Sequence, residues 1–91
     1  MIYPYMTLND GTEYTHTEMQ PDGTVIVYVE TPDEKDGFHS LVCILPTYEI
    51  KDIIGYNSSE QAAIINRIKK NAHLMIKYSQ SGGFASDAAS A

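Results

Sequence analysis

The chain has 91 residues, of which 43% are apolar, and a formal net charge of −6 at pH 7. This length and composition fit one small globular domain and leave no room for a second hydrophobic core. Residues 1–57 carry ten carboxylates and two lysines, whereas residues 58–83 carry four cations and one carboxylate. The acidic balance argues against general nucleic-acid binding, because an acidic surface repels phosphate groups at long range.

No targeting or membrane-spanning segment is predicted. Met1 to Tyr5 have neither the basic start nor the apolar run of a signal peptide, and no stretch approaches the roughly 20 apolar residues of a membrane span. Cys43 is the single cysteine, so it forms no internal disulfide, and its apolar neighbours indicate a buried thiol. We therefore expect a cytoplasmic protein without a membrane partner.

The first half of the chain predicts four β-strands separated by turns. Residues 2–8, 12–19, 24–31 and 38–45 are rich in β-branched and aromatic residues. An Asp-Gly pair lies between each strand and the next, and glycine supplies the positive φ that tight turns need. Residues 46–57 fit a turn, a short strand or a segment that folds over the sheet.

The second half predicts one long amphipathic helix. Ser58 and Gln61 have the spacing of a capping box, which places the helix start at Ser58, and Gly82-Gly83 predicts its end. Apolar or small residues recur with helical spacing at Ala62, Ile65, Ile68, Ala72, Met75, Ile76 and Ser79, with Ile64 on their flank.

These elements predict an α+β domain of residues 1–84. A four-stranded antiparallel meander packs one face against the helix, and residues 85–91 are expected to form a disordered tail. Four strands make a sheet about 19 Å wide, whereas one helix covers only about 10 Å. One helix therefore leaves much of such a sheet uncovered.

The opposite face of the sheet is the first candidate site. Strict alternation assigns Tyr3, Tyr5, Ile26 and Tyr28 to this face, and tyrosine is enriched at protein interfaces. Two interpretations remain open. The face is an interaction surface, or residues 46–57 and Phe84 fold over it.

A second candidate is polar. Tyr14, His16 and Glu18 share one face of a predicted strand and form an alternative site for acid–base chemistry or ligand binding, although a solvated strand face is the simpler interpretation. His39 and Cys43 would lie about 13 Å apart on a strand, and Asp33 to Asp36 lack the ligand spacing of a calcium loop. The sequence thus predicts no metal site, cofactor or catalytic residue.

The sequence favours a non-catalytic protein-interaction module that forms a homodimer. One concrete form is an acidic inhibitor or antitoxin-like protein whose carboxylates bind a basic protein partner. The alternative is a small ligand-binding or enzymatic domain that uses Tyr14, His16 and Glu18.

Overall fold

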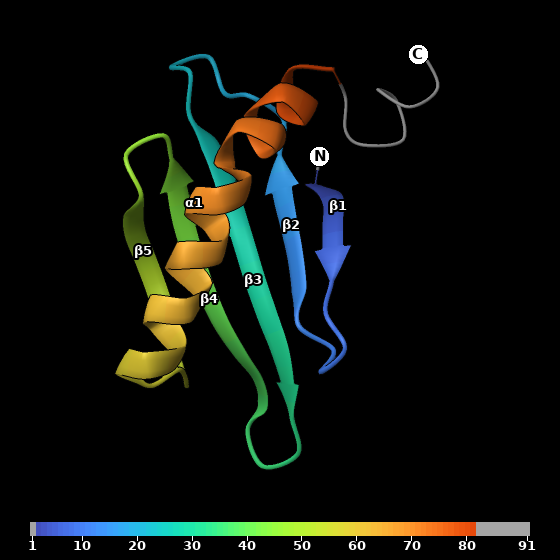
Figure 1. Ribbon diagram of the computed structural model, residues 1–91, viewed down its shortest axis with the longest axis vertical. Coiled ribbons are helices and arrows are strands. Elements are labelled where there is room, and N and C mark those ends of the chain that lie inside the picture. Colours follow the sequence, from blue (N-terminus) through green and yellow to red (C-terminus); the bar gives the residue numbers. More distant parts are fainter. Residues whose placement is uncertain (1, 82–91) are drawn as a thin grey trace.

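The computed structural model describes residues 2–81, and it consists of one antiparallel sheet and one helix (Figure 1). The elements are β1 (Ile2–Thr7), β2 (Glu13–Thr17), β3 (Val25–Asp33), β4 (Gly37–Leu45), β5 (Glu49–Ile54) and α1 (Ser58–Ser81). The spatial order of the strands follows the chain from β1 to β5. The predicted α+β class with a C-terminal helix is confirmed. The predicted Gly82-Gly83 stop, Phe84 and the tail lie outside the described residues.

The sheet has five strands, so the prediction of four was wrong. Residues 49–54 pair antiparallel with β4 and extend the sheet sideways. Alternation did not reveal this strand because the strand contains a β-bulge. Ile53 lies opposite Leu41 and Ile50 lies opposite Cys43, so Lys51 is the extra residue of the bulge. Residues that lie opposite each other point to the same face. Both isoleucines therefore point to the helix side of the sheet although they are three positions apart; Ile53 packs against the core, whereas Ile50 is 36% exposed.

The helix starts with a capping box one residue earlier than predicted. The Asn57 side-chain oxygen accepts a hydrogen bond from the Glu60 amide at 2.8 Å, and the Glu60 carboxylate accepts one from the Asn57 amide at 2.9 Å. Asparagine is a strong N-cap, and the reciprocal pair satisfies two amides that lack partners in the helix. The Gln61 amide group instead donates to the Tyr56 carbonyl.

The core lies between α1 and one face of the sheet, which we call the inner face. Val25, Val27 and Val29 of β3 alternate with outward residues and are fully buried there, beside Leu41, Cys43 and Leu45 of β4. The helix buries Ile64, Ile68, Ala72, Met75 and Ser79 against them, at spacings of three and four residues. Ile64 is thus central to the stripe, and Ala62, which was predicted on it, is exposed.

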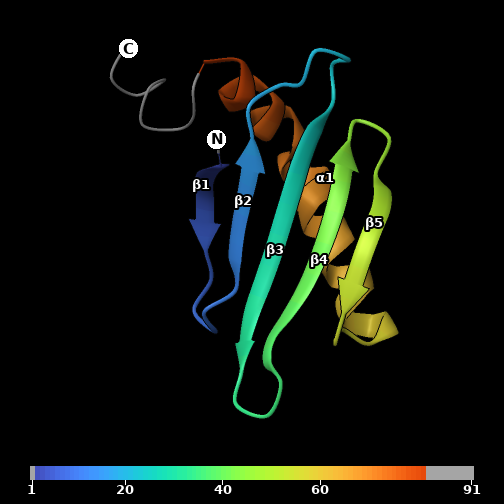
Figure 2. The same ribbon diagram turned by 180° about the vertical axis from the view of Figure 1, so that it is seen from behind.

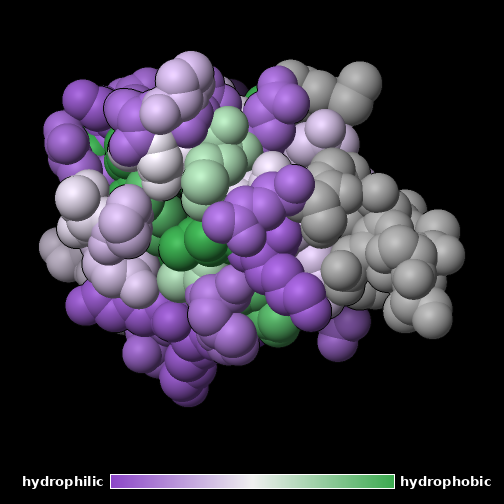
Figure 3. Space-filling model, turned by 90° about the horizontal axis from the view of Figure 1, so that it is seen from above, coloured by the Kyte–Doolittle hydropathy of each residue, from purple (hydrophilic) through white to green (hydrophobic). Residues whose placement is uncertain are grey.

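Seen from the upper end of Figure 1, the molecule shows hydrophobic residues near the centre of the view and hydrophilic residues around them (Figure 3). Apolar side chains therefore also reach the surface at this end of the molecule.

Candidate functional site

The face of the sheet opposite α1, which we call the outer face, is crossed by no described segment (Figure 2). Ile26 and Tyr28 of β3 lie directly opposite Ile44 and Val42 of β4, and all four side chains are partly exposed. Three further outward residues are about half exposed, namely Ile2 at 49%, Ile54 at 54% and Phe38 at 58%. The outer face therefore has an apolar centre and additional apolar side chains at its edges.

Carboxylates surround this apolar centre. Glu13 pairs with Glu30 across β2 and β3, while Glu49 and Asp52 of β5 lie opposite Ile44 and Val42. Among the cations of the described chain, only Lys51 is on a strand, and its ammonium lies 3.0 Å from the Glu49 carboxylate. The outer face is consequently apolar in the middle and negatively charged around it.

The structure divides the predicted tyrosine surface between the two faces. Ile26 and Tyr28 lie on the outer face, but Tyr3 lies opposite buried His16 and belongs to the inner face. The Tyr5 hydroxyl donates a hydrogen bond of 2.7 Å to the Asn71 side chain of α1, so Tyr5 also points toward the helix. Tyr3 and Tyr5 therefore share one face, as alternation predicts, but the pairing of β1 with β2 puts that face on the helix side of the sheet, and alternation within one strand cannot reveal which side that is.

The alternative polar set is not assembled into one accessible site. Tyr14 and His16 are 1% and 0% exposed, respectively, and both lie under α1 rather than on a solvated face. Glu18 follows β2 and is exposed. The His16 Nδ1 donates to the Thr17 carbonyl at 2.8 Å, because a carbonyl oxygen only accepts. Within residues 2–81, the other ring nitrogen is the one buried side-chain polar atom without a hydrogen-bond partner.

Tyr14 lines a cleft of about 200 Å³ between α1, the β1–β2 turn and the end of β3. Its polar lining includes Asp10, Tyr56, Glu60 and Arg67. Burial raises the pKa of the Tyr14 phenol, and the neighbouring Arg67 opposes this effect. Hydrogen bonds from Thr12 lower the pKa of the Asp10 carboxyl group. Phenols, carboxylates and one guanidinium group can hydrogen-bond a small polar molecule here, but neither His16 nor Glu18 lines the cleft.

A chain of hydroxyl groups runs from this cleft toward β4. The Tyr56 hydroxyl donates its one proton to the His39 carbonyl at 3.2 Å. The Thr31 hydroxyl lies 2.7 Å from the Tyr56 hydroxyl and therefore donates to the Tyr56 oxygen. Thr12 lies 2.7 Å from Thr31 and donates to it in turn. These contacts tie the ends of β2, β3 and β4 to the segment before α1.

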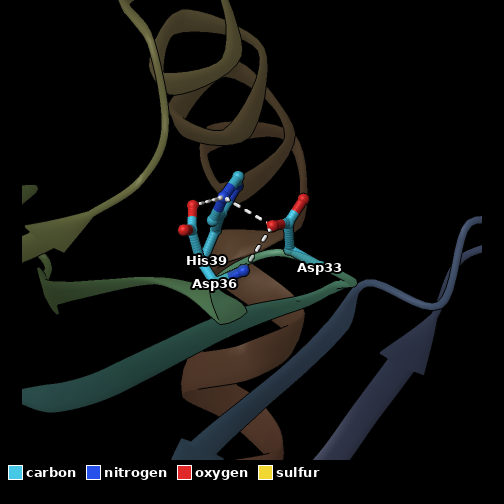
Figure 4. Close-up of side chains that lie close together, drawn as sticks. All are labelled: Asp33, Asp36 and His39. Carbon is cyan, nitrogen blue, oxygen red and sulfur yellow. Dashed lines mark hydrogen bonds and ion pairs between the residues drawn. The ribbon is translucent and has the colours of Figure 1, made fainter.

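Asp33, Asp36 and His39 converge at the β3–β4 turn (Figure 4). The His39 Nε2 lies 3.3 Å from an Asp36 oxygen and 3.8 Å from an Asp33 oxygen. That Asp33 oxygen also accepts hydrogen bonds from the amides of Lys35 and Asp36. Sequence reasoning examined His39 only with Cys43 and the aspartates only as a calcium loop. The D-x-x-D-x-x-H spacing across a Gly37 turn was the signal that it missed.

No family model, curated protein or solved structure matches the chain. Within residues 2–81, no helix combines the length and apolar content required to cross a membrane.

Proposed function

We propose that this chain is a non-catalytic protein-interaction module that pairs with a second copy of itself through the outer face of its sheet. The observation that carries the proposal is the uncovered apolar centre formed by Ile26, Tyr28, Val42 and Ile44. Contiguous apolar surface that a monomer leaves exposed is typical of protein interfaces. Symmetric pairs are also the commonest soluble oligomers.

The size of the outer face supports a stable pair. Five strands at about 4.8 Å spacing span about 24 Å, and strands of this length extend roughly 20–30 Å. The resulting area of roughly 500–700 Å² approaches the ~800 Å² that each partner contributes to a standard protein interface. The segment before α1 extends the sheet as β5 and does not cover this face.

The charges on the outer face determine how this pairing should depend on salt. Glu13, Glu30, Glu49 and Asp52 lie on the same face of each copy, so two such faces repel each other while their apolar centres attract. Salt screens this repulsion over about 8–10 Å near physiological ionic strength. Self-association should therefore become tighter as salt is added.

Sedimentation equilibrium over a concentration series at low and high salt tests the proposal. We expect a reversible dimer whose dissociation constant falls with added salt. The substitution Val42→Lys should abolish the dimer because it places an ammonium group in the apolar centre. Ala62→Lys is the matched control, since it adds the same charge at an exposed position on α1.

Three outcomes would contradict self-association through this face. They are a monomer at every concentration, a dimer that survives Val42→Lys, and a dimer that Ala62→Lys disrupts equally. Circular dichroism of each variant establishes that the fold is retained. A monomer that binds a basic protein, with an affinity that falls as salt rises, would instead support the acidic-inhibitor form of the function.

A further inference from the structure

Asp33, Asp36 and His39 have the chemistry of a divalent metal site. Their three candidate ligand atoms, two carboxylate oxygens and one imidazole nitrogen, all lie within 4.8 Å of one another. Two carboxylate groups that approach the same ring nitrogen repel each other unless a positive charge lies between them. A cation bound where the three side chains converge would offset this repulsion, beyond what the two amides that hydrogen-bond Asp33 already do.

The spacing of these atoms matches what a small metal ion leaves between its ligands. Zinc bonds to nitrogen and oxygen of about 2.1 Å in a tetrahedral centre place neighbouring ligand atoms roughly 3.4 Å apart. The His39 Nε2 lies 3.3 Å and 3.8 Å from the two aspartate oxygens. A metal ion can thus bind all three atoms with small side-chain movements.

Contacts outside the turn hold His39 in place. A Cβ atom on Gly55 would lie 2.2 Å from the His39 ring, so the imidazole occupies the space that the absent side chain leaves. The Tyr56 ring packs edge-on against the imidazole, with 5.6 Å between the two ring centroids, and the Tyr56 hydroxyl donates to the His39 carbonyl. A ligand that is already fixed in position loses little conformational entropy when a metal binds.

We propose that Asp33, Asp36 and His39 bind a divalent transition-metal ion, with Zn²⁺ as the best-fitting one. Imidazole suits zinc and its neighbours, whereas Ca²⁺ and Mg²⁺ prefer sites made of oxygen atoms alone. The Asp36 side chain is 66% exposed and that of His39 is 18% exposed, so the bound ion is reachable from solvent. Three protein ligands also leave a coordination position for water or for a further ligand.

Isothermal titration calorimetry with ZnCl₂ on the 91-residue chain without an affinity tag tests this site. We expect one equivalent of Zn²⁺ to bind. His39→Gln and Asp36→Asn should each weaken the affinity at least about 10-fold, since removing even an outer partner of a metal ligand typically costs about 10- to 100-fold. Amide NMR shifts on Zn²⁺ addition should concentrate at residues 33–39 and 55–56.

His73→Gln is the matched control, because His73 is an exposed histidine on α1, away from the hairpin. This variant should bind Zn²⁺ as the unmodified chain does. The proposal is overturned if no Zn²⁺ binds, if His39→Gln binds it unchanged, or if His73→Gln is the variant that loses it. Asp36→Asn tests the site with little risk to the fold, since that side chain is mostly exposed.

Discussion

Gly55 and His39 form a close contact that only a glycine permits. Gly55 has a φ of 89°, a conformation that disfavours side chains, and the His39 ring fills the position of its missing Cβ. The sequence places Gly55 immediately before Tyr56, but it gives no indication that a histidine 16 positions earlier packs on it. Such a contact arises only when β4 and β5 pair.

Gly55→Ala should therefore destabilise the protein more than a glycine replacement in open space. Gly23→Ala is the control, since Gly23 has a φ of 85° and no atom near its Cβ position. We expect Gly23→Ala to lower the free energy of unfolding by about 1–2 kcal/mol through backbone strain. Gly55→Ala should lower the free energy of unfolding by a further ~1–3 kcal/mol beyond this, because the new Cβ atom clashes with the His39 ring. Equal losses in urea unfolding would contradict the contact.

Helix α1 depends on its capping box and on its buried stripe. The sequence predicted the helix and most of this stripe because the periodicity is local and extends over about five turns. The helix begins at Ser58 as predicted, but the capping box was misassigned by one residue because Ser58-x-x-Gln61 and Asn57-x-x-Glu60 satisfy the same pattern. The hydrogen bonds of Asn57 and Glu60 distinguish the two.

A pair of alanine substitutions checks this assignment. Asn57→Ala should lower the free energy of unfolding by about 1 kcal/mol, because it removes the acceptor for the Glu60 amide. Ser58→Ala should change it by no more than about 0.5 kcal/mol, as expected for an exposed position without such a role. If Ser58→Ala is the more costly change by urea denaturation, the cap is misassigned.

The two edge strands were harder to predict than the helix or the central strands. β3 alternates cleanly, so its inner and outer residues followed from the sequence, whereas β4 is apolar on both faces and only its pairing with β3 puts Leu41, Cys43 and Leu45 in the core. The register shifts at Tyr5 in β1 and at Lys51 in β5 break this alternation, and bulges of this kind are concentrated at sheet edges. A bulge depends on pairing with the neighbouring strand, so a period of two along one segment cannot reveal it.

At the scale of the whole molecule, one helix covers one face of five strands, and the fold buries several tyrosine phenols and the Cys43 thiol fully or in part. Burial raises the pKa of the Tyr14, Tyr56 and Tyr5 phenols and of the Cys43 thiol. Each of these groups therefore keeps its proton to a higher pH in the folded protein than in the unfolded chain. The native protein should therefore be sensitive to alkaline pH.

We expect stability to fall as pH rises through the ordinary pKa values of 9.0 for cysteine and 10.0 for tyrosine. Above these values the unfolded chain binds fewer protons than the folded one, so raising the pH favours unfolding. Urea midpoints measured across this range check the prediction. Tyr14→Phe should make the decline shallower, and a midpoint that stays constant well above pH 10 would contradict it.

The sequence by itself determined the local features: the α+β class, the central strands, the long helix and the acidic first part of the chain. These follow from period, composition and turn residues that lie close together along the chain. Tertiary structure alone decided that Tyr3 and Tyr5 face the helix, that Tyr14 and His16 are buried, and that Asp33 and Asp36 meet His39 beside Gly55. Strand pairing sets these contacts, and pairing is a relation between segments that neither segment encodes separately.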